Sequence, residues 1–458
     1  VRKAPGPDGI PSWILRDFSP ILAEPVCSIF NASIAEGFVP SIWKSADIIA
    51  LPKTNPPVSI ESDLRPISLT PVLAKILESY VCKWVWNDYL PHVDPNQYGN
   101  IPGSSTVLAL INLLNNWSFE TDAKRKAVRI VLVDYKKAFD RINHDLLLRK
   151  LGNLQVNPTL VNWIRAFLCQ RKQRVKIDQI RSEWLTVNGG VPQGTKMGPL
   201  LFIIMITDLG CNLPVVKYVD DTTLYEICPY GENGTIQNTL NELAHWSDLN
   251  DMQINPMKTK EMVVCFMKDD PNLPYLTIGG NQVERVQDVK LLGLYLNNKL
   301  NWDTHVKETY TKAAKRLYLL VQLRRAGLNQ TDMCRYYVAC IRSVLEYACQ
   351  VFHGGLTKEQ SEMLESIQKR AVRIISPGLS YSDALVSLNL QSLSVRRQKL
   401  CLNLFTQIRN PSHMLNHLLP APRETRYSLR NSKDLYPPKC KTNRYKNSFI
   451  PWCLFNLQ

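Results

Sequence analysis

The chain lacks several features that would place it in other protein classes. None of its 12 cysteines forms a C-x-x-C pair, so the spacing typical of a zinc finger or zinc knuckle is missing. The longest apolar run, Leu200 to Ile206, is seven residues long, far short of the ~20 that span a bilayer. We find no internal repeat and no low-complexity tract. These absences predict a folded protein with reduced, buried thiols and no membrane span.

Length and charge indicate a multidomain protein with an acidic partner. A chain of 458 residues, 45% of them hydrophobic, is long enough for about two to four domains with real cores. The 55 Lys and Arg exceed the 40 Asp and Glu by 15. A surplus of this size favours nucleic acid over an anionic membrane as partner, although basic proteins without nucleic acid also exist. Because the chain begins with Val1 and not with Met, we expect it to be part of a longer product or to come from an incomplete gene model.

Hydrophobic patterning predicts a mixed α and β architecture. Residues 127–133 form a short, β-branched apolar run, which is typical of a buried strand. Residues 215–225 are rich in β-formers with two Asp in the middle, which is typical of a hairpin. The C-terminal part is basic, since residues 396–446 hold 12 Lys or Arg against Glu424 and Asp434. Helical periodicity is expected over 67–90, 235–250, 303–326, 331–351 and 358–375.

Three carboxylates stand where these strands end. Asp134 directly follows the apolar strand, and Asp220 and Asp221 occupy the tip of the hairpin. Each has an ordinary alternative, because Asp also caps helices and suits turns. Two carboxylates ~4 Å apart repel by about 4 kcal/mol at an effective dielectric near 20, so a cation must offset them. Magnesium takes oxygen ligands and keeps sites free for phosphate. If the strands pair, the three acids could share two such ions.

Ordered motifs give these acids a context. Tyr218 to Asp221 resembles the Y-x-D-D box of reverse transcriptases. Asp134 to Asp140 resembles the D-x-x-x-A-F-D box of non-LTR retrotransposon polymerases of the jockey and CR1-like groups. Between them, residues 189–195 resemble the G-x-P-Q-G-S box of that family, with Thr195 in place of the usual Ser. Residues 97–99 match a further box, but Asn100 and Ile101 replace the Phe-Arg that often follows, which leaves a template contact open.

The resemblance implies an α+β right-hand polymerase. Fingers and the start of the palm would occupy residues 1–125, and the palm with its antiparallel sheet 126–298, with part of the fingers inserted near 150–185. A helical thumb would span 299–378, and a basic segment of unknown role 379–458. The implied activity is that of an RNA-directed DNA polymerase, a nucleotidyltransferase that extends a primer 3′-hydroxyl by two-metal phosphoryl transfer during target-primed retrotransposition.

The same resemblance implies partners and residue roles. The partners are an RNA template, a DNA primer or target, deoxynucleoside triphosphates and two Mg²⁺ ions, with Mn²⁺ as a substitute, in a nuclear and cytoplasmic ribonucleoprotein. The metal ligands and catalytic acids are Asp134, Asp220 and Asp221, and Lys258, in a box resembling N-x-x-K-T, protonates pyrophosphate. The substrate-binding residues are Phe139, which excludes the ribose 2′-hydroxyl, Gln193 and Gly194, which contact template and nucleotide, and Lys53 and Arg65, which face the triphosphate.

Other interpretations stay open at this stage. Taken alone, Phe139 would be an ordinary core residue, and Lys53 and Arg65 would be solvated surface cations. The chain as a whole could be an inactive or truncated retroelement relic that only binds nucleic acid. An RNA-templated RNA polymerase is a further alternative, against which Phe139 argues, because such an enzyme must accept ribose.

Overall fold

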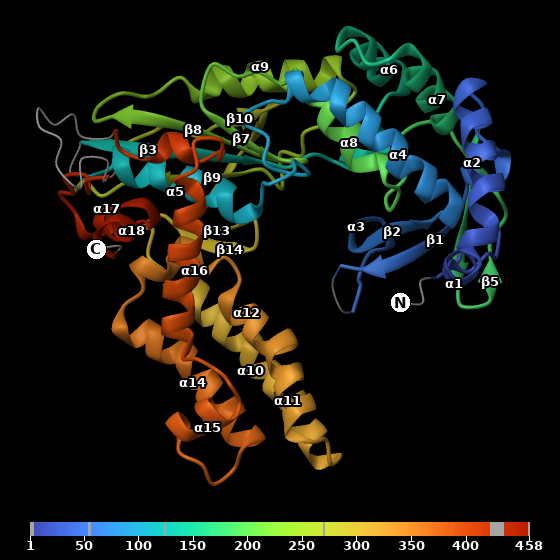
Figure 1. The fold of residues 1–458 in the computed structure, drawn as a ribbon. Coiled ribbons are helices and arrows are strands. Elements are labelled where there is room, and N and C mark those ends of the chain that lie inside the picture. The colour runs from blue at the N-terminus through green and yellow to red at the C-terminus, as the bar shows by residue number, and fades with distance from the viewer. Residues whose placement is uncertain (1–3, 54–55, 123–124, 269–270, 422–434, 457–458) are drawn as a thin grey trace, which may run out of the picture.

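The structure, a computed structural model, describes residues 4–53, 56–122, 125–268, 271–421 and 435–456 and is mixed α+β (Figure 1). A sheet with helices on both faces forms the body, and a smaller sheet lies at one end of it. A helical arm projects from the other end in the same direction as the small sheet (Figure 1). The predicted α+β class is therefore confirmed. Within the described ranges, no helix is long and apolar enough to cross a membrane.

The central sheet has the strand order β12-β9-β3-β8-β7. Strand β3 lies in its middle and pairs antiparallel with β8 on one side and β9 on the other. Both faces are covered, because Val128 and Ile130 enter one apolar core while Val131 and Val133 enter a second. Burial on both faces explains the uninterrupted apolar run. The strands are β3 (Lys126–Val133), β7 (Val215–Tyr218), β8 (Asp221–Pro229), β9 (Lys260–Val264) and β12 (Glu284–Arg285).

Helices cover the two faces of this sheet differently. Helix α5 contributes eight buried residues, most of them to the core that continues into the helical arm. The opposite core is built with a group of helices from the first half of the chain and α9. The helices that cover the two faces are α2 (Ser19–Ala35), α4 (Val72–Tyr89), α5 (Thr106–Glu120), α6 (His144–Asn153), α7 (Pro158–Leu168), α8 (Met197–Met205) and α9 (Ile236–Leu249).

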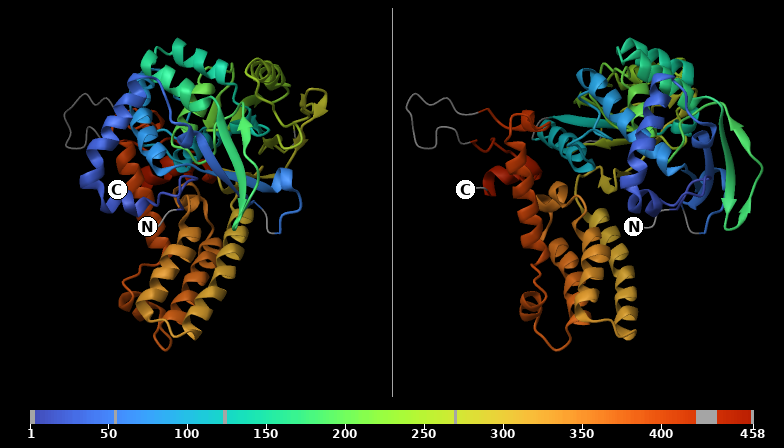
Figure 2. Two further views of the ribbon diagram at one scale, coloured as in Figure 1. Left: turned by 90° about the vertical axis from the view of Figure 1, so that its right-hand side faces the viewer. Right: turned by 45° about the vertical axis from the view of Figure 1, so that its right-hand side comes forward.

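The smaller sheet joins segments that are far apart in sequence. Strand β1 pairs antiparallel with β2 and parallel with β4, which carries the β4–β5 ribbon. This ribbon, green in Figure 2, projects from the body. Short elements α1 (Ser12–Asp17) and α3 (Ile60–Asp63) flank the sheet, whose strands are β1 (Ser45–Pro52), β2 (Leu64–Leu69), β4 (Arg171–Ile177), β5 (Ile180–Arg181) and β6 (Leu185–Val187).

The helical arm begins after two small hairpins. Its long helix α10 packs against α14, and Gly327 follows α10 with a φ of +79°, as expected for a C-terminal cap. The hairpins are β10 (Thr277–Ile278) with β11 (Asn281–Gln282), and β13 (Asp288–Leu291) with β14 (Leu294–Asn297). The helices are α10 (Asp303–Arg325), α11 (Gln330–Tyr336), α12 (Ser343–Glu346), α13 (Cys349–Phe352), α14 (Lys358–Ile375) and α15 (Tyr381–Ser387).

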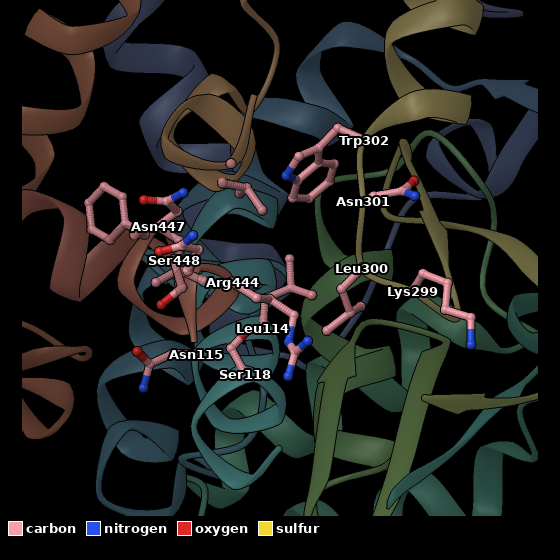
Figure 3. A pocket seen from close by; sticks show the side chains of 15 residues that line it. Leu114, Asn115, Ser118, Lys299, Leu300, Asn301, Trp302, Arg444, Asn447 and Ser448 are labelled. Carbon is pink, nitrogen blue, oxygen red and sulfur yellow. The ribbon is translucent and has the colours of Figure 1, made fainter. Parts of the chain in front are cut away.

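The C-terminal part returns from the arm to the body. Helix α16 (Leu393–Ile408) packs on α13 and α14, and α17 (Asn443–Lys446) and α18 (Phe449–Asn456) lie against α5. The carboxylate of Asp122 accepts hydrogen bonds from the amides of Lys441 and Thr442 and from the Thr442 hydroxyl, at 2.7 to 2.9 Å. A cavity of about 270 Å³ remains at this junction, lined by α5, residues 299–302 and residues 443–449 (Figure 3). None of the predicted site residues lines it.

Two predicted helices differ from the observed ones. Residues 64–69 form β2, and the helix expected from residue 67 begins only at Val72. Pro71 explains this, because a proline disfavours helical backbone in the residue before it. The helix expected over 331–351 contains a π segment at Tyr337–Arg342 and breaks at Ala348, whose φ is +51°. At that break the Tyr347 hydroxyl donates to the Leu292 carbonyl at 2.8 Å, which no local pattern indicates.

Candidate active site

Strand register brings the first acid beside the other two. Val133 of β3 pairs with Thr222 of β8, so the next residue of β3, Asp134, comes opposite Asp221. Neighbouring strands lie ~4.8 Å apart, so their side chains can act on one site. The β7–β8 hairpin is tight, since Tyr218 pairs with Asp221 and only Val219 and Asp220 form the turn. The predicted hairpin and the predicted pairing are therefore both present.

The three carboxyl groups influence one another electrostatically. Burial raises the pKa of Asp221 to about 6, helped by the negative charges of Asp220 and Asp134. Burial also raises the pKa of Asp220, again with a contribution from Asp134, while Arg65 opposes the rise. Like charges close together disfavour ionisation, and at Asp220 and Asp221 this adds to the effect of burial. The protein's own side chains therefore do not balance the negative charge of these carboxylates.

The segment around Lys258 packs against the end of β3. The Asp134 carbonyl accepts from the Asn255 amide at 2.7 Å, and the Asp134 amide donates to the Thr259 hydroxyl at 3.3 Å. Burial raises the pKa of Asp134, and Lys258, the Asn255 side chain and Lys53 oppose that rise. Lys258 therefore faces the acid cluster from an exposed position. Asn255 and Thr259 were not singled out as site residues, although both stand in the box that drew attention to Lys258.

Two cations of the small sheet also act on the acids. Arg65 lies on β2 opposite Leu51 of β1, and Lys53 directly follows β1. Arg65 opposes the rise that burial causes in the pKa of Asp220, and Lys53 opposes the corresponding rise in the pKa of Asp134 and of Asp140. Both side chains are exposed. The small sheet thus presents positive charge toward the carboxylates of the central sheet.

Phe139 lies on a short 3-10 turn, Ala138–Arg141, five residues after Asp134. Its ring stacks on Phe202 of α8, with centroids 4.6 Å apart and planes 20° apart, and it is only half-buried. Such stacking fixes the plane of a ring whose other surface remains accessible.

The loop at 189–195 bridges the two sheets. The Val191 amide donates to the Phe139 carbonyl at 2.8 Å, and the Gln193 carbonyl accepts from the Ser68 amide of β2 at 2.7 Å. Gly194 has a φ of +111°, and a Cβ there would meet the Ser68 carbonyl oxygen at 2.9 Å, so only glycine fits. Thr195 turns inward, where its hydroxyl accepts from the Gly198 amide at the start of α8.

A cavity of about 430 Å³ lies beside this loop. Its lining comes from β1, β2, β4 and residues 189–193, and Asp140 and Gln193 face it. The Gln193 amide is 3.5 Å from the Asp140 carboxylate, whose pKa burial raises. Asp140 was not singled out individually, although it closes the D-x-x-x-A-F-D box. A carboxylate and an amide are therefore among the groups that line this cavity.

The acid cluster fits divalent cations by its chemistry. Its donors are carboxylate oxygens, which are the ligands that magnesium prefers. Burial and, after it, neighbouring negative charge raise the pKa of Asp220 and Asp221, and a bound cation would oppose both effects. In the part of the chain that the structure describes, no three His, Cys, Asp or Glu side chains converge in a ready metal geometry. Coordination would therefore draw the three side chains together.

Comparison with known proteins identifies the family to which these features belong. The profile described as "Reverse transcriptase (RNA-dependent DNA polymerase)" matches residues 51–296, more than half of the chain. The probable RNA-directed DNA polymerase from transposon BS of Drosophila melanogaster is 26% identical over 82% of this chain and 43% of its own length. The polymerase of the mobile element jockey, from the same organism, is 27% identical over 82% and 42%. The chain thus spans less than half the length of these relatives.

Among solved structures, apo telomerase from Candida tropicalis is similar with a TM-score of 0.43 and 11% identity, over 87% of this chain and 68% of that one. The resemblance to retrotransposon polymerases noted in the motifs is confirmed by the relatives above.

Proposed function

Because the chain belongs to the reverse transcriptase family, we propose that it is an RNA-directed DNA polymerase that extends a primer 3′-hydroxyl with deoxynucleotides. The observation that carries this proposal is the register of β3 on β8, which sets Asp134 beside Asp221 and the hairpin turn. An RNA template, a DNA primer or target and deoxynucleoside triphosphates would be its partners. Because these relatives are named as polymerases of a transposon and a mobile element, it would act in target-primed retrotransposition, inside a nuclear and cytoplasmic ribonucleoprotein.

Asp134, Asp220 and Asp221 would hold two Mg²⁺ ions, or Mn²⁺ in their place. When bound, such ions activate the primer hydroxyl and neutralise charge on the departing pyrophosphate. The fit rests on three carboxylates whose pKa values are raised by burial, with a further rise at Asp220 and Asp221 from neighbouring negative charge. Without cations these groups would repel a polyanionic substrate.

The remaining site residues would bind and orient the substrates. Arg65 and Lys53 would hold the triphosphate, for which the planar fork of arginine is suited. Lys258, whose charge already acts on Asp134, would donate a proton to pyrophosphate. Phe139 would lie beneath the incoming sugar and clash with a ribose 2′-hydroxyl. Gln193 and Gly194 would contact the template and the incoming nucleotide from the loop that joins the two sheets.

We assign the parts of a right hand accordingly. Residues 1–125 would be the fingers and the start of the palm, and part of the fingers would be inserted near 150–185. The pairing of β4 with β1 supports this insertion. Residues 126–298 would be the palm and 299–378 the thumb. The basic segment of unknown role would be residues 379–458. Within its described part, residues of α16 and α18 share an apolar core with α5 and the helices of the arm. We propose that this segment supports the thumb, and that its basic surface follows the nucleic-acid backbone.

Extension of oligo(dT) on poly(rA) with Mg²⁺ tests the proposal. The wild-type chain should incorporate dTTP, and Asp220→Asn should not, while both bind the template-primer with similar affinity. An inactive wild type that still binds the duplex would indicate a nucleic-acid-binding relic. Preference for UTP over dTTP would indicate an RNA polymerase. Extension by Asp220→Asn at the wild-type rate would overturn the catalytic assignment.

A further inference from the structure

The turn that carries Asp220 and Asp221 has an unfavourable backbone. Val219 is its first central residue and has a φ of +59°. A two-residue hairpin with a positive φ at that position normally uses glycine. A β-branched side chain is disfavoured there by steric clash with its own backbone. Something outside the hairpin must therefore hold Val219 in this conformation.

Residues 94–99, here called the clamp segment, run alongside β7 and meet this turn. The Lys217 amide donates to the Asn96 carbonyl and the Tyr98 amide donates to the Lys217 carbonyl, both at 2.8 Å. These bonds form a parallel bridge between Gln97 and Lys217. The clamp segment thus pairs with the outer edge of β7, the last strand of the central sheet.

The Gln97 side chain binds the turn itself. Its Oε1 accepts from the Val219 amide at 3.0 Å and from the Gly99 amide at 2.8 Å. The reversed amide orientation would set the NH₂ group against two N–H donors, so the hydrogen bonds fix the oxygen on this side. Gln97 is only 2% exposed. A side chain so buried has no surface with which to touch a template.

Close packing and a buried ion pair keep the clamp segment in place. A Cβ on Gly99 would meet the Val219 nitrogen at 2.4 Å, so the two backbones touch without any side chain between them. The Lys217 ammonium is fully buried and contacts the Asp94 carboxylate at 2.5 Å and the Ile206 and Leu209 carbonyls at 3.0 Å. Both ends of the segment are thereby anchored to the strand that leads into the turn.

We propose that Gln97 is a positioning residue of the polymerase reaction, which holds the Val219 amide and so fixes the turn bearing Asp220 and Asp221. This inference rests on the proposed function. It assigns the box at 97–99 to the geometry of the acids rather than to the template. Gln97 touches neither substrate nor metal in this role and acts through the backbone of the turn.

The main test is Gln97→Met, which keeps the length of the side chain and removes the acceptor. The Gln97 amide nitrogen is buried without a partner among the described residues, so its loss offsets part of the cost to stability. Because small misplacements of reacting groups slow catalysis strongly, kcat for dTTP incorporation should fall roughly 10- to 100-fold. KM for dTTP and the Kd for template-primer should stay within about twofold.

Two further variants separate positioning from general stability. Gln368→Met is the matched control, because Gln368 is fully buried in the helical arm and bonds Tyr337 and Tyr381. It should lower the melting temperature without changing kcat. Gln97→Glu retains an acceptor oxygen and should recover much of the activity lost in Gln97→Met. If Gln97→Met does not fold, kcat of Gln97→Ala is compared with kcat of Gln97→Glu instead.

A double variant tests the route through the turn. Val219→Gly removes the strain at positive φ. The fold loss of kcat caused by Gln97→Met should therefore be at least about threefold smaller in the Val219→Gly background than in the wild type. Mn²⁺ affinity of the free protein, measured by electron paramagnetic resonance, should fall in Gln97→Met. This measurement does not depend on primer extension. If the wild type fails to extend primers, only the proposed function is refuted. Unchanged kcat and Mn²⁺ affinity, or loss confined to template affinity, would overturn the inference.

Discussion

Replacing Asp221 by Asn is expected to abolish primer extension and to stabilise the metal-free protein above pH 6. Burial and the charges of Asp220 and Asp134 raise the pKa of this carboxyl from 3.8 to about 6. The folded protein therefore keeps a proton that the unfolded chain releases. Its free energy of unfolding falls as the pH rises from about 4 to about 6. Asn has the same shape without the charge and removes this penalty.

The size of the effect follows from the pKa difference. A shift of about two units corresponds to at most ~3 kcal/mol. Although the protein around its carboxyl group raises the pKa, Asp221 as a whole residue is exposed, so solvent screening reduces the contribution to about 1 kcal/mol. For a chain of this length, that gain raises the melting temperature by about 1–3 °C at pH 8 and leaves it unchanged near pH 4. The extension rate should fall at least roughly 100- to 1,000-fold, as when a key charge-stabilising group is removed.

Thermal unfolding in a chelator between pH 4 and 8 measures the stability effect. Asp248→Asn is the matched control, because Asp248 is exposed on α9 and is not among the carboxylates that raise the pKa of Asp221. It should change neither stability nor activity. Added Mg²⁺ should raise the melting temperature of the wild type more than that of Asp221→Asn. A variant that melts below the wild type at pH 8 would refute the reasoning, since it would show that the carboxylate stabilises the metal-free fold.

Other changes test the remaining roles. Phe139→Ala should admit ribonucleotides in a competition with deoxynucleotides, and unchanged sugar selectivity would contradict the gate. Asn255→Ala removes a hydrogen bond that lowers the pKa of Asp134, so the acidic limb of the pH–rate profile should move to higher pH; an unmoved limb would exclude this role. Asp122→Ala leaves three donors of residues 441–442 unpaired and should cost about 2–4 kcal/mol in thermal unfolding. An unchanged melting temperature would show that the C-terminal segment is held elsewhere.

The sequence predicted the centre of the fold well because local and long-range signals agree there. The apolar run of β3 and the hairpin at 215–225 each have a single reasonable interpretation, and β3 on β8 pairs the residues that the motifs mark. The observed strands at 126–133, 215–218 and 221–229 lie within a few residues of those expected. The acids follow from this pairing. A one-residue slip would turn every side chain of β3 to the other face of the sheet, so the observed register is the one that brings Asp134 opposite Asp221.

The C-terminal part shows where composition misleads. Its excess of Lys and Arg suggested a separate basic segment, yet Cys401, Phe405 and Ile408 enter the same core as α5 and the helical arm. Their spacing of three and four residues marks one helical face, which the average charge conceals. The contact of Asp122 with residues 441–442 joins positions that no local pattern connects. The average composition of the segment reflects mainly its exposed residues, whereas the spacing of its apolar residues shows which of them are buried.

Buried polar residues near the acids were the hardest to interpret from the sequence. Lys217 stands between Val216 and Tyr218, where a cation would ordinarily face solvent, but it is fully buried. A buried ammonium is tolerated only with close partners, and Asp94 and two carbonyls supply them from distant segments. The box at 97–99 marks Gln97 without indicating what it contacts, and no motif marks Lys217. Both side chains contact only other parts of the chain, so their part in holding the acids follows only from the structure of β7, the turn and the clamp segment.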